Sequence, residues 1–217
     1  MDSPAYIKLD KEDFLAHLVD NEYHKRRENR MRRFLRDAKV RFPSACLEEL
    51  DYNSKRGLRK EVIREVASGR YLENKQNVLI SGATGAGKTY LASALAGHAC
   101  RNLNKTRYWR MTRMLEEMRV EKATGDYLKA LDKMKKLRVL VIDDLGPEIL
   151  TGEQKTIMME IVEDRYLTGS TIIASQLPFE QWYEVFGDQA TADAICDRIF
   201  HNAIKINLKG DSMRKKS

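Results

Sequence analysis

The stretch that decides the fold is residues 77–96, NVLISGATGAGKTYLASALA. A short apolar run at 77–81 precedes a glycine-rich turn, and an Ala/Leu-rich run begins at residue 90. The first run predicts a buried strand and the last predicts a helix. Within the turn, Gly82, four residues and then Gly87-Lys88-Thr89 match the pattern G-x-x-x-x-G-K-[ST] of a phosphate-binding loop.

Each residue type in this loop has a chemical reason to be there. Glycine lets the backbone turn where a Cβ would clash, so that successive N–H groups point at phosphate oxygens. Lys88 is expected to reach the β- and γ-phosphates of ATP, and the hydroxyl of Thr89 to ligate Mg²⁺. The positive end of the following helix attracts the same anion. The predicted nucleotide-binding residues are Gly82, Ala83, Thr84, Gly85, Ala86, Gly87, Lys88, Thr89 and Tyr90.

Length and composition narrow the class of protein. A chain of 217 residues that is 42% hydrophobic suits one α/β domain with an appendage. No apolar run approaches the ~20 residues that cross a bilayer, and the N-terminus lacks the basic and apolar regions of a signal peptide. We therefore expect a cytoplasmic protein with no membrane partner. The three cysteines are far apart and odd in number, which predicts reduced thiols and no metal site built on them.

The positive charge of the chain is gathered in blocks. The formal net charge is +7, and residues 21–41 alone hold nine Lys/Arg against three Asp/Glu. Residues 11–42 predict an amphipathic helix that Asp10 caps and Pro43 ends, with an apolar stripe from Phe14 to Phe42. The basic face is a solvated surface or a DNA-binding arm, and it can be both. The residues predicted to contact DNA are Lys25, Arg26, Arg27, Arg30, Arg32, Arg33 and Arg36 on this arm, and Arg113, Arg119 and Lys122 in a second basic stretch, 112–138.

From residue 77 onward, strand-like and helix-like segments alternate. The expected strands are 77–81, 106–111, 138–143, 170–175 and 203–208. Such alternation predicts a three-layer α/β fold with a five-stranded, mostly parallel sheet covered on both faces. Ligands of these sheets bind at the carboxyl ends of the strands, so further functional residues are expected there.

The segment RVLVIDDLG, residues 138–146, carries two of them. Asp143 is expected to hold the Mg²⁺ that Thr89 binds, and Asp144 to act as general base on the attacking water. The alternative is an ordinary acidic turn after a strand. Many ATPases of this type have Glu where Asp144 stands, and Asp is one methylene shorter, so we expect slow turnover that DNA or a partner stimulates.

Three further positions are weaker candidates. Ser175 and Gln176 end a predicted strand and are expected to contact the γ-phosphate or the water, or else to be an ordinary polar strand end. Arg198 precedes the last strand and is either an arginine finger for a neighbouring subunit or part of a surface salt bridge. Arg214 is either a second phosphate sensor or part of a basic tail.

Taken together, the motifs resemble the IstB/DnaC group of AAA+ ATPases. The resemblance runs through ENRMRRFLRDAKVRFPSACLEELDY, the phosphate-binding loop, VLVIDDLG, IIASQLPFEQWYEVFGD, ADAICDRIFHNA and LKGDSMRK, which together cover nearly the whole chain from about residue 11. The portion SQLP…W…GD…ADAICDR…HNA is similar to the IstB branch, the helper ATPases of insertion-sequence transposons.

This resemblance implies an AAA+ P-loop ATPase domain over 46–217 without a C-terminal lid domain, preceded by a basic helical segment over 1–45. It implies an ATP-dependent homo-oligomer, ring or filament, that coats and remodels duplex DNA through backbone contacts, selects target sites and recruits or activates a transposase. Ser175-Gln176 match the sensor-1 position, Arg198 the box VII arginine finger and Arg214 the last position of G-x-S-x-R.

Three alternatives remain open on the sequence. A DnaC-like helicase loader would prefer single-stranded DNA and bind a replicative helicase. A small-molecule kinase on a P-loop fold would need an acceptor pocket and have no use for Arg198 or a basic arm. A DNA-binding scaffold that has lost hydrolysis would produce no ADP.

Overall fold

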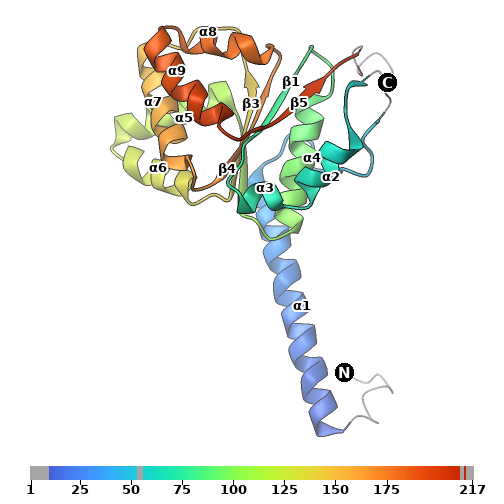
Figure 1. The fold of residues 1–217 in the computed structure, drawn as a ribbon. Helices are drawn as coiled ribbons and strands as arrows, with labels where there is room; N and C mark the ends of the chain where they lie inside the picture. The colour runs from blue at the N-terminus through green and yellow to red at the C-terminus, as the bar shows by residue number, and fades with distance from the viewer. Residues whose placement is uncertain (1–9, 53–55, 211–212, 214–217) are drawn as a thin grey trace.

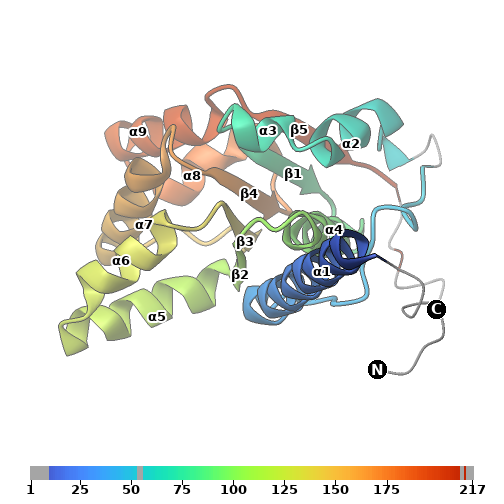
Figure 2. The same ribbon diagram turned by 90° about the horizontal axis from the view of Figure 1, so that it is seen from below.

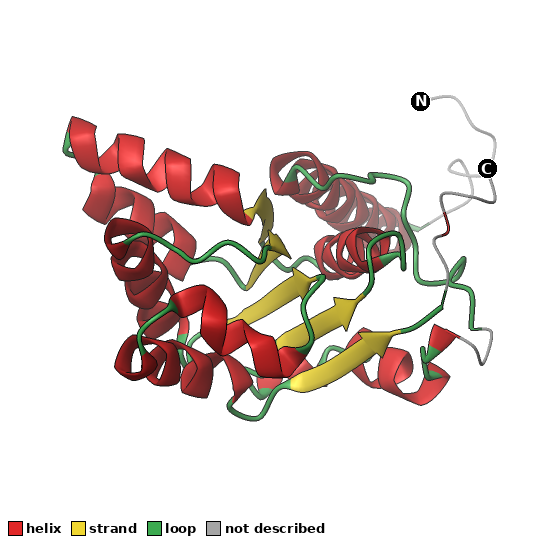
Figure 3. Cartoon of the chain, turned by 90° about the horizontal axis from the view of Figure 1, so that it is seen from above, coloured by secondary structure: helices red, strands yellow, loops and turns green. Residues whose placement is uncertain are grey.

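The computed structural model describes residues 10–52, 56–210 and 213. Its sheet contains β1 (Val78–Gly82), β2 (Thr106–Arg110), β3 (Val139–Leu145), β4 (Ser170–Ser175) and β5 (Ile204–Leu208). The order is β2-β3-β4-β1-β5, and each neighbouring pair is parallel (Figure 3). All five strands lie where the sequence predicts them, and the P-loop α/β fold is confirmed.

Helices cover both faces of the sheet. One layer is α2 (Lys60–Ala67), α3 (Arg70–Glu73) and α4 (Lys88–Arg101). The other is α5 (Met111–Thr124), α6 (Tyr127–Lys135), α7 (Gly152–Arg165), α8 (Trp182–Phe186) and α9 (Gln189–Phe200), with a 3-10 turn at Phe179–Gln181 (Figure 1). Side chains alternate between two cores: Val78 and Ile80 pack with α4, and Leu79 packs on the opposite face. A capping box of Thr151 and Gln154 starts α7.

The long helix α1 (Lys11–Ala38) begins as predicted and ends earlier than predicted. Asp10 caps it, accepting a 2.8 Å hydrogen bond from the amide N of Asp13. The prediction that it continues to Pro43 is wrong, because Lys39 adopts a left-handed conformation with φ of 51° and closes the helix after Ala38. The early end lets Val40 pack against the core and turns the next residues toward the carboxyl ends of the strands.

The apolar residues of α1 form two separate faces. Phe34 and Ala38 are buried against Cys100 of α4, whereas Phe14 and Leu18 are each 40% exposed. At 3.6 residues per turn, these two pairs project from roughly opposite sides of the helix. The expected continuous stripe is therefore wrong, and the first half of α1 projects away from the domain body (Figure 1). No described helix is both long and apolar enough to span a membrane.

A buried arginine joins three elements at the amino ends of the strands. The guanidinium of Arg165, at the end of α7, is 3% exposed and donates to the carbonyls of Met134, Leu137 and Ser170 and to the hydroxyl of Thr171, over 2.7–3.1 Å. Burial lowers its pKa to about 10. These bonds tie α6 and the start of β4 to α7.

We predict that Arg165→Met destabilises the fold. Methionine fills much of the volume but leaves the three carbonyls and the hydroxyl without their donor, and each unsatisfied buried group costs about 1–3 kcal/mol. We expect the free energy of unfolding, measured by urea denaturation, to fall by about 4 kcal/mol or more. Lys129→Met, which removes an exposed cation on α6, is the control and should change little. Equal stability of both variants would contradict this assignment.

Candidate functional site

Three of the five predicted catalytic residues, Lys88, Asp144 and Gln176, lie in one cavity at the carboxyl ends of the strands. The cavity has a volume of about 500 Å³. The segments that line it include three in which the sequence predicts site residues: the loop after β1 with the start of α4, the end of β3 and the residue after β4. The predicted site residues on its surface are Thr84, Gly85, Gly87, Lys88, Thr89, Tyr90, Asp143, Asp144 and Gln176.

The phosphate-binding loop has the backbone that its glycines predict. Gly87 has a φ of 92° and caps α4, which begins at Lys88, so the amide end of that helix opens toward the cavity. A Cβ on Gly82 would lie 2.3 Å from the carbonyl oxygen of Leu208, so only glycine allows β5 to pass this closely. The Nζ of Lys88 donates to the carbonyl of Ala83 across the loop at 2.9 Å.

A residue outside the G-x-x-x-x-G-K-[ST] motif stabilises the phosphate-binding loop by a hydrogen bond. Arg56, in the connector before α2, donates from Nη2 to the carbonyl of Ala86 at 2.6 Å. Its side chain is 13% exposed, and its Nη1 lies 3.7 Å from a carboxylate oxygen of Asp51. Arg56 therefore stabilises the loop through a hydrogen bond to a backbone carbonyl. Its positive charge also lies close to where the phosphates of a nucleotide are expected to bind.

Asp143 is buried and held by a tyrosine. It continues the alternation of Val139 and Val141, so its side chain points to the face of the sheet that α4 covers. The hydroxyl of Tyr108 on β2 donates to its Oδ2 at 2.5 Å. Burial, and then this hydrogen bond, raise the pKa of Tyr108 well above its ordinary value, so the phenol keeps its proton and remains a donor.

Asp144 has an unusual backbone and a cationic partner. Its φ is 66°, and the register of β3 against β4 shifts between Asp143 and Leu145. This bulge turns Leu145 back into the core and leaves the Asp144 side chain about half exposed at the cavity. Its Oδ2 accepts from Nη2 of Arg110 at 2.5 Å, and the hydrogen bond and charge of Asp144 raise the pKa of Arg110. Strained backbone of this kind clusters at functional sites.

The donor set suits a magnesium ion held with a triphosphate. Thr89 and Asp143 supply hydroxyl and carboxylate oxygens, the hard ligands that Mg²⁺ prefers. Mg²⁺ sites with nucleotides commonly use one or two protein oxygens, phosphate oxygens and water. Among the described residues there is no cluster of three or more His, Cys, Asp or Glu that would bind a metal by itself.

The last residue of β4 and the residue that follows it differ in position. Gln176 lies on the cavity, and its Oε1 accepts from the hydroxyl of Thr84 at 3.0 Å. Ser175 is fully buried; its hydroxyl donates to the carbonyl of Leu145 at 2.6 Å and accepts from the amide N of Leu177 at 3.0 Å. Ser175 thus fixes the strand end next to the bulge, and Gln176 is the one whose side chain faces the ligand space.

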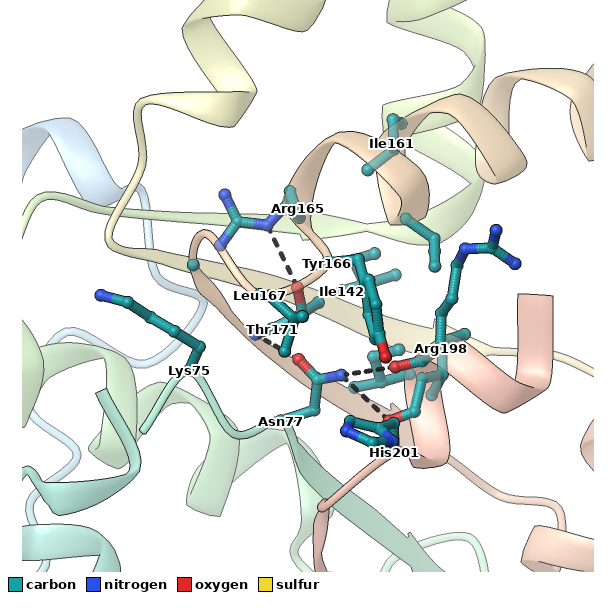
Figure 4. A pocket seen from close by; sticks show the side chains of 14 residues that line it. Lys75, Asn77, Ile142, Ile161, Arg165, Tyr166, Leu167, Thr171, Arg198 and His201 are labelled. Atoms are coloured by element: carbon teal, nitrogen blue, oxygen red, sulfur yellow. Dashed lines mark hydrogen bonds between the residues drawn. The ribbon is translucent and has the colours of Figure 1, made fainter. Parts of the chain in front are cut away.

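Arg198 lies at the other end of the sheet. Asn77, just before β1, donates from Nδ2 to the carbonyls of Arg198 and Ile199 at 3.3 and 3.0 Å (Figure 4). Because β1 runs from there to the phosphate-binding loop, roughly 15 Å of strand separates Arg198 from its own nucleotide cavity. Its Nε lies 2.6 Å from Oε2 of Glu163 on α7, with the two side chains 31% and 56% exposed. Arg198 therefore cannot serve its own site.

The residues predicted to contact DNA lie on two helices. Lys25, Arg26, Arg27, Arg30, Arg32, Arg33 and Arg36 are exposed along α1, and Arg113, Arg119 and Lys122 are exposed on α5. These helices flank β2 on the same side of the domain (Figure 2). Arg26 and Arg32 form exposed ion pairs with Glu22 and Glu28 at 2.6 Å, which reduces the free charge of α1. Arg214 lies outside the described residues.

Sequence reasoning missed several residues at the cavity. Arg110 at the end of β2, Arg41 and Phe42 in the turn after α1, and Met213 line it, and the buried Tyr108 on β2 holds Asp143. The end of β2 was predictable, because a parallel strand next to β3 ends at the same edge of the sheet. The position of Arg41 was not, because it depends on where α1 ends and how that end packs on α4.

The chain matches the model of a known protein family along most of its length. The match to the IstB-like ATP binding protein family covers residues 4–217. An insertion-sequence ATP-binding protein of Sinorhizobium fredii, y4pL, is 36% identical over 96% of this chain and 84% of its own. The ATP-binding protein of insertion sequence IS1162 from Pseudomonas fluorescens is 37% identical over 81% of this chain and 76% of its own.

Solved structures share the fold at lower identity. DnaI superposes with a TM-score of 0.66 at 23% identity, covering 82% of this chain and 94% of its own. DnaA from Aquifex aeolicus with bound AMPPCP gives a TM-score of 0.65 at 20% identity, over 81% of this chain and 53% of its own. These likenesses establish a P-loop ATPase fold of the AAA+ type.

We predict that Tyr108→Phe lowers the affinity of the nucleotide-binding cavity for Mg²⁺. The substitution removes the hydroxyl that orients Asp143, and loss of such supporting hydrogen bonds typically costs about 10–100-fold in metal affinity. The Mg²⁺ concentration for half-maximal binding of a fluorescent ATP analogue should rise about 10-fold or more. Tyr166→Phe, at the opposite end of the sheet, is the matched control. If Tyr108→Phe and the control bind with the same Mg²⁺ dependence, the supporting role is ruled out.

Proposed function

Because the chain belongs to the IstB-like ATP-binding protein family, we propose that it is a DNA-binding helper ATPase of insertion-sequence transposition. The observation that carries the proposal is the meeting of Lys88, Thr89, Asp143, Asp144 and Gln176 in one cavity. A binding loop alone would suffice to hold ATP. The carboxylate at 144 and the amide at 176 add the groups that hydrolysis needs.

The proposed mechanism assigns one task to each side chain. The loop amides and Lys88 hold the β- and γ-phosphates, and Thr89 and Asp143 would hold a Mg²⁺ that would neutralise charge on them. Asp144 accepts the proton of the attacking water, and Gln176 orients that water or the γ-phosphate. The chemistry yields ADP and phosphate. Asp144 must first leave Arg110, which supports slow basal turnover.

Arg198 completes the site of a neighbouring subunit in this proposal. Its distance from its own cavity leaves a second copy as the place where its guanidinium could meet a γ-phosphate. An arginine finger stabilises the charge of the transition state and contributes about 10³–10⁵ in rate. Hydrolysis then depends on assembly of a homo-oligomer, ring or filament.

The exposed cations of α1 and α5 support binding to the phosphate backbone of duplex DNA. Contacts of this kind position a protein without reading bases. In the proposed role the ATP-bound oligomer coats and remodels DNA, selects a target and recruits or activates a transposase. A helicase loader is the competing assignment, and it predicts stimulation of hydrolysis by single-stranded DNA in preference to duplex.

The shared site predicts complementation between two inactive variants. Asp144→Asn keeps the finger and loses the base, and Arg198→Ala keeps the base and loses the finger. Each alone should release phosphate on the order of 10³-fold more slowly than the parent. In an equal mixture about one interface in four joins an intact base to an intact finger, so roughly a quarter of the parent rate should return.

Phosphate release from the mixture on long duplex DNA, with ATP and Mg²⁺, is the measurement. Lys88→Ala mixed with Asp144→Asn is the control and should recover nothing, because both variants lack a working cavity. Full activity of Arg198→Ala by itself would refute the shared site while leaving ATP binding untouched.

The basic arm predicts a loss of DNA affinity that is the same for every sequence. Charge reversal of Arg30, Arg32 and Arg33 to Glu removes three cations from α1. The slope of log K against log salt should fall by about one for each lost phosphate contact. Fluorescence anisotropy with two unrelated duplexes at several salt concentrations measures this slope. The matched control reverses Arg59, Lys60 and Arg64 at α2, with the same change in charge; equal losses in both triple variants would exclude a specific role for α1.

A further inference from the structure

The nucleotide cavity contains a charged residue that the proposed mechanism does not use. The charged residues that line it in the described part of the chain are Arg41, Lys88, Arg110, Asp143 and Asp144. Lys88 belongs to the phosphate-binding loop, and Arg110 pairs with Asp144. Arg41 comes instead from the turn that follows α1, the helix that carries the basic arm.

The turn that carries Arg41 is anchored to α4 on both sides. Before the turn, Phe34 of α1 is buried against Cys100 of α4, and the two helices lie side by side (Figure 2). After it, the amide N of Phe42 donates to the Oγ of Ser93 on α4 at 3.4 Å. Because α4 begins within the phosphate-binding loop, these contacts hold the backbone of Arg41 in a defined position relative to that loop.

The guanidinium of Arg41 keeps its N–H donors available. Its Cζ lies 6.0 Å from the centroid of the Phe42 ring, and that ring lies 6.2 Å from the ring of Tyr90. A contact with an aromatic face leaves the N–H groups in the plane of a guanidinium unused. Within residues 10–52, 56–210 and 213, no hydrogen bond or ion pair holds this guanidinium. Its donors can therefore bind a ligand without first breaking another contact.

The charge of Arg41 acts at the end of the cavity where Asp143 lies. Burial raises the pKa of Tyr108 most, and the hydrogen bond and charge of Asp143 raise it further, whereas the positive charges of Arg41 and Arg110 lower it. Arg41 thus lies near the carboxylate that is proposed to hold Mg²⁺. That ion bridges the β- and γ-phosphates of a nucleotide, so phosphate oxygens are expected on this side of the cavity.

The shape of the cavity decides which phosphates can approach this guanidinium. A guanidinium can hold phosphate oxygens through two parallel hydrogen bonds. A cavity of about 500 Å³ admits the phosphates of a nucleotide, whereas a DNA duplex is too wide to enter. We propose that Arg41 is a nucleotide-binding residue that contacts the β- and γ-phosphates of ATP and so joins the end of α1 to the nucleotide. This inference rests on the proposed function for the presence of ATP in the cavity.

The contact is measured by displacing a fluorescent ATP analogue with ATP or with ADP in the presence of Mg²⁺. In Arg41→Met the affinity for ATP should fall about ten-fold or more, because hydrogen bonds from a charged group are lost. The affinity for ADP, which lacks the γ-phosphate, should fall less. Arg41→Lys keeps the charge and should recover part of the affinity. Arg70→Met removes an exposed arginine of α3 that does not line the cavity; this matched control should bind ATP as the parent does.

Chemical modification locates the contact in the unsubstituted chain. Phenylglyoxal reacts with exposed arginines, and Arg41 and Arg70 are both exposed. At saturating ATP and Mg²⁺ the modification of Arg41, followed by mass spectrometry of the digested protein, should slow about five-fold or more, because the nucleotide shields the group that it occupies. The modification of Arg70 should proceed at the same rate with and without ATP.

The outcomes separate this inference from the proposed function. Equal ATP affinity of Arg41→Met and the parent, or equal modification of Arg41 with and without ATP, overturns the inference and leaves the proposed function standing. A loss of duplex affinity in Arg41→Met with unchanged ATP affinity makes Arg41 a DNA contact and overturns the inference as well. If the parent itself does not bind ATP, the proposed function and the inference are both wrong.

Discussion

The site depends on the parallel alignment of β1 between β4 and β5, with β3 next to β4. Parallel strands deliver all their carboxyl ends to one edge of the sheet, so three loops far apart in sequence must meet there. Ser81 pairs with Ser175, and Leu145 pairs with Ser175 from the other side. That register brings the loop after Gly82, the side chain of Asp143 and Gln176 to one cavity. No side chain of the site needs to reach far, and each is fixed by the strand that ends beside it.

The same alignment explains why Arg198 is separated from its own cavity. A helix that returns the chain to the start of a parallel strand must end at the amino edge of the sheet. α9 ends there, immediately before β5, and Asn77 binds its last carbonyls. The fold thus exposes the cavity at one edge and Arg198 at the other. Two copies placed head to tail can join these edges, whereas one copy cannot, which is the geometric argument for a composite site.

Short sequence patterns predict those features of the structure that short-range interactions determine. The strands, the loop at Gly82–Thr89 and the pair Asp143-Asp144 follow from apolar runs, glycine positions and the rule for strand ends. The residue at which α1 ends and the position of Arg41 at the cavity do not follow from such patterns, because both depend on packing between α1 and α4. The apolar residues of α1 show the limit most clearly. Their 3.6-residue spacing predicts a helix but does not say which face packs, and Phe14 and Phe34 project from opposite sides. The position of Arg110 at the site could have been predicted, because β2 ends beside β3 at the same edge of the sheet.

Two ion pairs occupy groups that the proposed mechanism must release. Arg110 holds Asp144, and Glu163 holds Arg198. Both pairs are substantially exposed to water, and pairs of that kind contribute about 0–1 kcal/mol. They cost little to break, so a triphosphate in the cavity or a neighbouring subunit can exchange them for stronger contacts. At that strength they favour the paired state of each group by no more than about five-fold. In the proposed mechanism, both groups are therefore released by exchanging two weak contacts, without any rearrangement of the sheet.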